Sequence, residues 1–424
     1  MLPSHVKAIT ILLFLSAVLP ALFPADRSFA DEPFDTNNSA VRLLQKGEYE
    51  KALALLQKTF SLFPYNDAVR NNLASAYAAL AKRQLEEKRF DEAAGNFEQA
   101  LKLTPDNRDF SILRGIALHA GKHYDEAIIV LDQARHAGGD SPTLLFYLGK
   151  AYYDSGNMEG ALEAWDKALA LEPGNKTLRD MAEKARREYA VESPMGRGYR
   201  SLFVISYDGG TGSDLVQSVL EQLDTAFNRV GSDFDYYPTA RVPVILYTRK
   251  DFRDITHGPD WSGGIYDGKV RLPIGGAAAL TPVLRGVLFH EYAHVVVGEL
   301  TNRNCPVWLN EGLAEVEGRR EYDPPLAALA SAVKRGKLLP FADLEKSMLG
   351  LNAHDAALAY QQSYSLARYL VSSYGWHKVR ELLVNLGTGK SFADAFSAAF
   401  GDYGLDYPKI VEAWKETVGK EYGN

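Results

Sequence analysis

The amino-acid sequence predicts an α-helical repeat solenoid followed by an α+β domain, in which a small mixed sheet precedes a helical half. A pattern of small and large apolar residues recurs every 34 residues in the first half of the chain, as in helical repeat proteins. The second half begins with strand-like apolar runs and continues as helical segments. A chain of 424 residues, 46% of them hydrophobic, is long and apolar enough for two or three domains.

The overall charge excludes one broad class of function. The chain holds 47 Lys and Arg residues against 54 Asp and Glu residues, which gives a formal net charge of -7. Proteins that bind nucleic acid need a basic surface that neutralises phosphate groups. We therefore expect no nucleic-acid partner.

The first thirty residues have the features of a signal peptide. An apolar run over residues 8–18 is followed by Pro20 and by small residues at Ser28 and Ala30, the pattern that signal peptidase recognises. We expect cleavage after Ala30 and an exported protein, periplasmic or secreted. The run is shorter than the ~20 residues that span a bilayer, so an uncleaved signal is the alternative and the one membrane association that we expect. Residues 31–39 are polar and should form a linker.

The clearest repeat is PTLLFYLGKAYYDSGNMEGALEAWDKALALEPGN, residues 142–175. Its packing positions hold Leu145, Leu148, Gly149, Tyr152, Ala161, Trp165, Ala168 and Pro173. The preceding copy starts 34 residues earlier at Arg108, and two weaker copies come before it. One of these has seven extra residues, about two helical turns, which should lengthen its first helix. We expect four helical hairpins over residues 40–175, closed by a helix over residues 176–190.

This pattern resembles the tetratricopeptide repeat. The resemblance implies a solenoid over residues 40–190 whose concave face binds a protein partner, because each hairpin has too little core to be stable alone. His119 and His123 lie four residues apart, but Gly121 interrupts the helix between them and a third ligand is missing. We expect no metal site at these two histidines.

A change of composition over residues 191–198 predicts a linker to a second domain, residues 199–424. In this domain SLFVISYDGG and RVPVILYT are apolar strands, separated by a helical segment over residues 213–230. Residues 263–276 alternate around an Asp-Gly turn, which predicts a hairpin or an exposed edge strand. Beyond residue 279 the pattern is mainly helical.

The segment FHEYAH carries two histidines and a glutamate with the spacing HExxH. Thr281 can cap a helix and Pro282 suits its first position, so TPVLRGVLFHEYAHVVVGEL should be one helix. On this helix His290 and His294 lie one turn apart on the same face, where both imidazoles can reach one ion. Glu291 lies one position round and can contact a water molecule that the ion holds.

A polar interruption in a buried helix is the alternative explanation of this motif. Its neighbours are all uncharged, namely Val287, Leu288, Tyr292, Ala293, Val295 and Val296. Two histidines and a carboxylate buried among them need partners, or they carry a desolvation cost of several kcal/mol. A metal ion supplies those partners, and we therefore expect one zinc ion.

A second helix, VWLNEGLAEVEG, follows the motif helix after a loop. On it, Glu311 could reach the ion, and Glu315 lies one turn later on the same face. HExxH followed by WLNEGLAE resembles the gluzincin metallopeptidases, the relatives of thermolysin and of the aminopeptidases. The likeness is greatest to the peptidase MA-like domains often found behind tetratricopeptide repeats, and in layout it covers roughly residues 199–421.

The resemblance implies a zincin-like fold and zinc-dependent hydrolysis of peptide bonds. It implies that His290, His294 and Glu311 bind the zinc ion and that Glu291 is the general base. Glu315 matches an acid that supports a ligand histidine. Zinc held by two neutral histidines and one carboxylate keeps an open position for water. Glu291 would take the proton of this water and deliver it to the leaving amine.

The resemblance also implies a catalytic tyrosine. Gluzincin aminopeptidases carry a tyrosine three residues before a glycine at the head of a long apolar helix, and its hydroxyl stabilises the oxyanion. In AYQQSYSLARYL, Tyr360 matches this place, with Ser363 where the glycine stands. Tyr364 is the competing candidate, and packing on a helix is the alternative for both tyrosines.

Two departures from the family pattern bear on function. Sixteen residues separate His294 from Glu311, fewer than in the enzymes named above, which shortens the loop between them. The glycine-x-methionine-glutamate-asparagine signature that recognises a free amino terminus is absent, and GGIYDG occupies the comparable strand. This favours an endopeptidase that binds an extended substrate along residues 264–272 over a standard aminopeptidase.

Three functions remain open from the sequence. The first is an exported zinc endopeptidase whose repeats recruit a protein or peptide substrate. The second is a non-catalytic, repeat-based binding protein with a zinc-binding pseudo-peptidase domain, although a structural site would not need Glu291 as a general base. The third is a zinc hydrolase that acts on another bond or trims peptides from one end.

Overall fold

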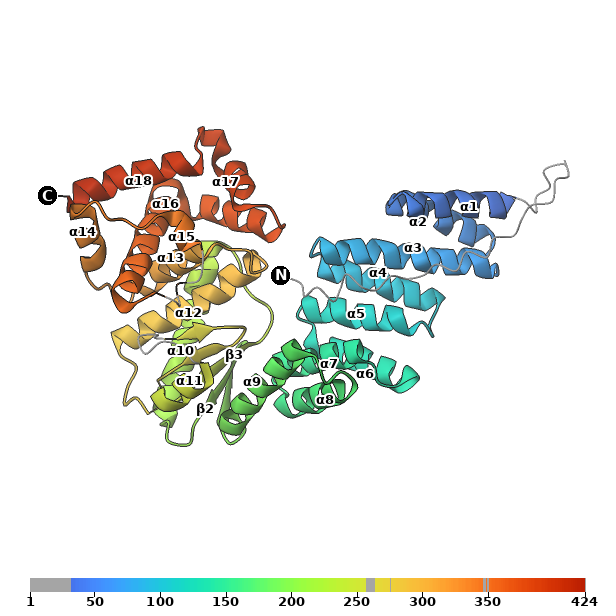
Figure 1. The fold of residues 1–424 in the computed structure, drawn as a ribbon, viewed down its shortest axis with the longest axis horizontal. Helices are drawn as coiled ribbons and strands as arrows, with labels where there is room; N and C mark the ends of the chain where they lie inside the picture. The colour runs from blue at the N-terminus through green and yellow to red at the C-terminus, as the bar shows by residue number, and fades with distance from the viewer. Residues whose placement is uncertain (1–31, 257–263, 275, 346–347, 349–350, 424) are drawn as a thin grey trace. The chain divides into compact units, whose positions relative to one another are not determined.

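The computed structural model describes residues 32–256, 264–274, 276–345, 348 and 351–423 (Figure 1). The chain divides into two compact units, residues 1–76 and residues 77–424. The expected signal peptide, residues 1–30, lies outside the described residues. Within the described ranges, no helix combines the length and the hydrophobicity that a membrane span requires.

The first unit contains α1 (Glu32–Gln45), α2 (Tyr49–Leu62) and the start of α3 (Asp67–Glu86). Helix α1 covers most of residues 31–39, where we had expected a linker. The polar residue Asn37 is buried in this helix and accepts a hydrogen bond of 2.9 Å from the Asn72 amide. A polar segment can therefore be helical here, because its buried amide has a partner inside the unit.

The second unit continues the helical hairpins with α4 (Phe90–Leu103), α5 (Arg108–Ala120), α6 (Tyr124–Gly138), α7 (Pro142–Ser155), α8 (Met158–Leu171) and α9 (Lys176–Glu192). Helix α3 has 20 residues, against 13 in α5 and 14 in α7, so the insertion does lengthen a first helix. Gly149 lets α7 and α8 cross closely, since a Cβ atom there would lie 2.3 Å from Trp165 Nε1. The predicted helical hairpins and the helix that follows them are confirmed.

A five-stranded mixed sheet follows, with the order β1-β2-β3-β5-β4. Its strands are β1 (Gly196–Arg200), β2 (Phe203–Tyr207), β3 (Val242–Leu246), β4 (Ile265–Tyr266) and β5 (Val270–Leu272). Strands β2, β3 and β5 are parallel, and β1 and β4 are antiparallel to their neighbours. Strand β1 lies mostly within residues 191–198, expected to be a linker. Its glycine-rich sequence gives no strand signal. Glycine is nevertheless needed at Gly198, because a Cβ atom there would lie 2.9 Å from Ile205 Cγ2.

Helices α10 (Ser213–Phe234) and α12 (Pro282–Leu300) share one apolar core with the sheet. The helical half adds α13 (Val307–Gly318), α14 (Ala327–Lys334), α15 (Phe341–Leu344), α16 (Ala353–Gly387), α17 (Phe392–Phe400) and α18 (Tyr407–Tyr422). A short helix, α11 (Arg249–Thr256), follows β3. In Figure 1 the helices of the helical half, α13 to α18, lie on the side of α12 away from the strands. The predicted α+β class, with a small mixed sheet and a helical half, is confirmed.

Candidate metal centre

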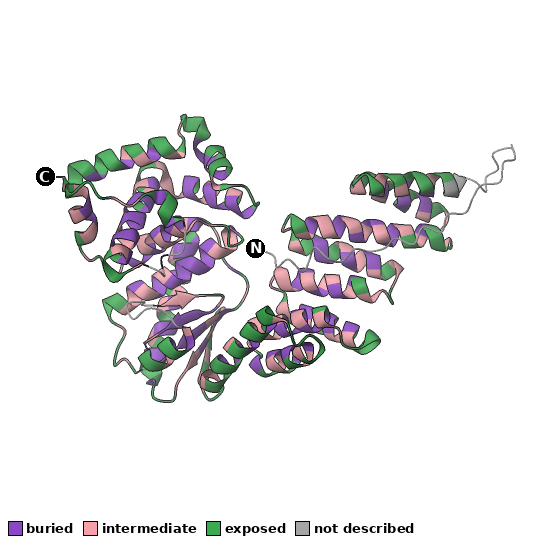
Figure 2. Cartoon of the chain, in the orientation of Figure 1, coloured by how far each residue is buried: buried purple, intermediate pink, exposed green. Residues whose placement is uncertain are grey.

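Helix α12 carries the HExxH motif and begins and ends where the sequence predicts. The Thr281 hydroxyl accepts a hydrogen bond of 3.2 Å from the backbone N–H of Leu284, and Pro282 opens the helix. Most of the helix is buried between the sheet and the helical half (Figure 2). His290 and His294 therefore lie on one face of a helix whose position is fixed by packing in the domain core.

Glycines bring the second ligand helix, α13, close to the first. A Cβ atom on Gly318 would lie 2.8 Å from the backbone oxygen of Gly286, so α12 and α13 touch through their backbones. On the other side of α13, a Cβ atom on Gly312 would lie 2.4 Å from the backbone oxygen of Ser363 in α16. These contacts place three helices around Glu311, which precedes Gly312.

We expect Gly312→Ala to destabilise the protein and to weaken metal binding. The added methyl group must displace the α16 backbone, at a cost of about 1–3 kcal/mol in the free energy of unfolding. Denaturant unfolding and zinc titration measure the two effects. Gly95→Ala is the control, because Gly95 lies in helix α4 with no atom within 4 Å of an added Cβ. Equal stability of the two variants would contradict the proposed tight contact.

The donor atoms of His290, His294 and Glu311 converge within 4.8 Å of one another. The two Nε2 atoms are 3.1 Å apart, and Glu311 Oε2 lies 3.5 Å from each of them. Donors of a tetrahedral zinc site with bonds of about 2.0–2.1 Å lie roughly 3.3 Å from one another. The three residues therefore fit a zinc ion in both donor type and spacing.

The charges around the donors also favour a cation. Burial opposes the charged form of His290, but its contacts with Glu311 and Glu315 raise the pKa of this imidazole well above its usual value. Burial likewise opposes the ionised form of Glu311, but the two histidines hold the pKa of this carboxyl well below its usual range. Glu315 Oε1 lies 3.3 Å from His290 Nδ1, which leaves His290 Nε2 to face the other donors. This arrangement fixes the imidazole orientation that a metal ligand needs.

Arg319, which was not predicted from the sequence, completes this arrangement. Its Nε donates a hydrogen bond of 2.8 Å to Glu315 Oε2, and its Nη1 donates one of 2.7 Å to the backbone oxygen of Pro324. The guanidinium carbon also lies 4.5 Å from the centroid of the Tyr364 ring. The spacing of Glu315 and Arg319, four residues apart on a helix, was the available signal.

Glu291 is buried beside the donors, with 4% of its surface exposed. Within the described residues its Oε2 atom has no hydrogen-bond partner. Burial raises the pKa of this carboxyl, and the two histidines oppose that rise. Gly264 lies against the side chain, since a Cβ atom there would be 2.5 Å from Glu291 Oε1. A buried carboxylate oxygen without a partner is costly for stability, which indicates a role other than packing.

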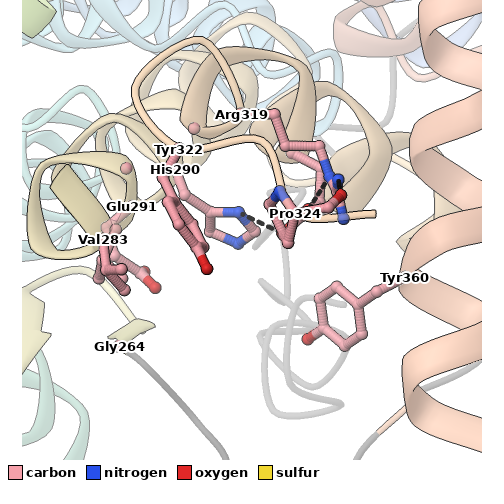
Figure 3. A pocket seen from close by; sticks show the side chains of 12 residues that line it. Gly264, Val283, His290, Glu291, Arg319, Tyr322, Pro324 and Tyr360 are labelled. Carbon is pink, nitrogen blue, oxygen red and sulfur yellow. Dashed lines mark hydrogen bonds and ion pairs between the residues drawn. The ribbon is translucent and has the colours of Figure 1, made fainter. Parts of the chain in front are cut away.

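His290 and Glu291 line a cleft of about 290 Å³ (Figure 3). Tyr360 lines this cleft from α16, across from Glu291, and its hydroxyl contacts Glu311. Burial raises the pKa of Tyr360, so its hydroxyl keeps its proton at neutral pH. Tyr364, one turn later, is buried between the guanidinium groups of Arg319 and Arg368. Of the two candidate tyrosines, only Tyr360 faces the cleft.

The two histidines of the repeat region do not share a site. His119 Nε2 lies 2.7 Å from an oxygen of Asp154, and His123 Nε2 lies 2.9 Å from an oxygen of Asp91. Each imidazole thus has its own carboxylate partner on a neighbouring helix, which accounts for both residues without a metal ion.

Comparison with known proteins shows two families along the chain. Residues 233–420 match the Peptidase MA superfamily, and residues 79–142 and 142–175 match tetratricopeptide repeats. The Hsp70-Hsp90 organizing protein of Triticum aestivum is 31% identical over 103 residues. That match covers 24% of this chain and 18% of the relative, so the chain spans less than a fifth of the length of that relative.

Two solved structures have a similar helical part. The MamA MSR-1 C2 structure is 18% identical, with a TM-score of 0.30, over 38% of this chain and 88% of the other. TTC0263, a thermophilic tetratricopeptide-repeat protein of Thermus thermophilus, is 20% identical, with a TM-score of 0.23, over 36% and 98%. Nothing about function follows from these low scores. The chain carries tetratricopeptide repeats over residues 79–175 and a Peptidase MA superfamily domain over residues 233–420, which indicates a metallopeptidase.

Proposed function

We propose that the protein is a zinc endopeptidase. The observation that carries this proposal is the convergence of the donor atoms of His290, His294 and Glu311 next to the buried, unpartnered oxygen of Glu291. A zinc ion held by these donors would polarise a water molecule and the scissile carbonyl. A purely structural metal site would have no use for the fourth group, the carboxylate of Glu291.

Glu291 is the residue that moves protons in this proposal. Its carboxylate accepts a proton from the attacking water as the new C–O bond forms, and it returns that proton to the nitrogen as the C–N bond breaks. The rise in its pKa by burial suits both steps, because the group must be able to hold the proton between them. Its place deep in the cleft keeps bulk water from exchanging that proton.

Tyr360 has the position of an oxyanion donor. Its protonated hydroxyl lies across the cleft from Glu291, so it can donate a hydrogen bond to the carbonyl oxygen as negative charge develops there (Figure 3). We expect Tyr360→Phe to lower kcat by about 10²–10³-fold with little change in KM, because the bond forms only in the transition state. Peptide kinetics measure both constants, and zinc content should stay at one ion per chain.

Tyr364→Phe is the matched control for this prediction. Tyr364 lies one turn from Tyr360 on the same helix but contacts Arg319 and Arg368 instead of the cleft. Its loss should affect stability more than turnover. If the two phenylalanine variants lose kcat equally, the oxyanion role of Tyr360 is wrong.

The sheet offers an edge for an extended substrate. Among the described strands, β4 is one of the two edge strands of the sheet and pairs with β5, and the preceding Gly264 lies against Glu291. The edge expected along residues 264–272 is limited to β4, because β5 already pairs with β3 on one side and with β4 on the other. A peptide backbone that pairs with β4 would run past the catalytic carboxylate without needing a particular side chain. This supports internal cleavage over removal of a terminal residue.

Substrate specificity would come from the wall of the cleft before His290. Val283 and Val287 line this wall from α12, and Tyr322 and Pro324 line it from the loop after α13. Val283 and Tyr322 are exposed although apolar. An apolar substrate side chain would cover them, so we propose a preference for bonds next to such a residue.

Mass-spectrometric mapping of a diverse peptide pool tests the proposed function. Zinc-loaded protein should produce internal cuts, whereas terminal trimming would favour an exopeptidase. No cleavage despite one bound zinc ion per chain would favour a repeat-based binding protein with a pseudo-peptidase domain.

We also propose that the repeats recruit a protein substrate or partner. We further propose that a signal peptide over residues 1–30 directs the enzyme to the periplasm or the exterior.

A further inference from the structure

The β4–β5 hairpin, which borders the cleft, is held by the last helix of the repeat region. Both lie in the unit of residues 77–424. Arg271 of β5 is 1% exposed, and it donates a hydrogen bond of 2.9 Å to Glu188 Oε1 and one of 3.1 Å to Glu192 Oε1. Both glutamates belong to α9, which these hydrogen bonds place next to the sheet (Figure 1). A third bond of 3.1 Å runs from Arg271 Nε to Asp267 Oδ1 at the hairpin turn.

More charged groups of the hairpin pair with α9. Lys269 Nζ lies 3.4 Å from Glu188 Oε2 and 3.6 Å from Glu192 Oε2, and Lys184 of α9 donates a bond of 2.6 Å to Asp267. We call the six residues the α9–hairpin cluster: Lys184, Glu188, Glu192, Asp267, Lys269 and Arg271. Three positive and three negative charges balance within it.

Two tyrosines complete the α9–hairpin cluster. The Tyr153 hydroxyl of α7 donates a bond of 2.6 Å to Glu188 Oε2, and the Tyr247 hydroxyl accepts one of 2.6 Å from Arg271 Nη1. Burial would raise the pKa of Asp267, but Arg271 and Lys184 hold it at about 2. Asp267 is therefore ionised at neutral pH.

A cluster of this kind adds specificity of arrangement more than stability. Taking charges out of water costs nearly what their attraction returns, so buried ion pairs contribute little to the net free energy of folding. Each charge must nevertheless meet its partners, and a shifted hairpin would leave Arg271 or Glu188 buried and unpaired. The cluster therefore disfavours other positions of the hairpin relative to α9.

The hairpin connects this cluster to the catalytic carboxylate over a short path. Arg271 pairs across the hairpin with Ile265 in the antiparallel register. Ile265 packs against an apolar cluster that includes Tyr247 and Phe252 and is flanked by Val191 of α9. Gly264, the residue before Ile265, lies against Glu291. Displacement of Arg271 would thus shift the strand that borders Glu291.

We propose that Arg271 is a positioning residue, which uses α9 of the repeat region to fix the β4–β5 hairpin beside Glu291. The inference rests on the proposed peptidase function only for its effect on catalysis. The repeat region then has a structural part in the active site, in addition to any partner that it binds. Loss of the contact should loosen the hairpin and impair the binding of an extended substrate, while the metal ligands on α12 and α13 stay in place.

The test compares the full-length wild type with Arg271→Lys and with the milder Glu192→Gln. Lysine keeps the charge but lacks the fork that reaches Glu188, Glu192 and Asp267 together. In Arg271→Lys we expect amide hydrogen exchange over residues 264–272 to rise by about tenfold or more, with little change over residues 287–297. Zinc content should remain at one ion per chain.

Kinetics separate positioning from a general loss of stability. For Arg271→Lys we expect kcat/KM to fall by about tenfold for a long peptide and to change little for a blocked dipeptide, which cannot pair along the hairpin. The control is Arg186→Gln, also on α9, because Arg186 forms an exposed ion pair with Asp166 instead of contacting the hairpin. This control should match the wild type in exchange and in kinetics.

Two results would overturn the inference. The first is that amide hydrogen exchange over the hairpin is no faster in Arg271→Lys and Glu192→Gln than in the control Arg186→Gln. The second is that the hairpin exchanges faster but kcat/KM falls equally for long and short substrates. If the wild type cleaves no peptide, the proposed function fails, and hydrogen exchange still decides whether α9 fixes the hairpin.

Discussion

Glu291→Gln is expected to retain one zinc ion per chain and to lose peptide hydrolysis by about 10²–10⁴-fold in kcat. Zinc should stay because Glu291 is not one of the three converging donors. Turnover should fall because an amide of the same shape cannot accept a proton from water. Metal analysis of the purified variant and steady-state kinetics on a cleaved peptide measure the two quantities.

Glu299→Gln is a suitable control for this variant. Glu299 lies on the same helix but forms its contacts with Lys122 and Tyr236, away from the donors. Its substitution should leave kcat close to that of the wild type. Near wild-type turnover in Glu291→Gln, by contrast, would remove the general base from the proposal.

His290→Ala is expected to lose both zinc and turnover. It leaves only two donors, and it also removes the group that Glu315 contacts at 3.3 Å. A ligand that binds only the folded state stabilises it, by about 2.7 kcal/mol at a free zinc concentration of 100 times Kd. Chelation of zinc should therefore lower the Tm of the wild type and leave the Tm of His290→Ala unchanged, as calorimetry can show.

Glu315→Gln tests the supporting contact separately. Groups that orient a ligand histidine change metal affinity by about 10–100-fold, far less than the loss of a donor. We expect this variant to bind zinc more weakly but measurably and to keep part of its activity.

A His290→Ala variant that binds zinc as tightly as the wild type would place the metal elsewhere in the chain.

Much of the fold was predictable because its signals are local. Thr281 and Pro282 set the start of α12, and the Asp-Gly pair at residues 267–268 forms the turn of the β4–β5 hairpin. The 34-residue period predicted the hairpins, and the seven-residue insertion predicted a long α3. Each of these signals acts between residues close in sequence, which local propensities and caps determine.

The misses occurred where packing overrides local preference. Strand β1 is glycine-rich and polar, so it has no strand signal of its own, and pairing with β2 makes it a strand. Helix α1 is polar where a linker was expected, and Asn37 is stabilised in it by Asn72. The partner of β1 is the strand that follows it, β2. The partner of Asn37 lies 35 residues away in α3.

The sequence by itself determined the motif helix, the second helix, and the candidate donors and general base, since HExxH places its residues within one helical turn. Only the tertiary structure decided that α12 and α13 approach through Gly286 and Gly318, that Tyr360 rather than Tyr364 faces the cleft, and that Arg271 meets α9. These facts depend on distances between segments that lie far apart in the chain. Such distances are set by the packing of whole helices and strands, which periodicity along a single segment does not encode.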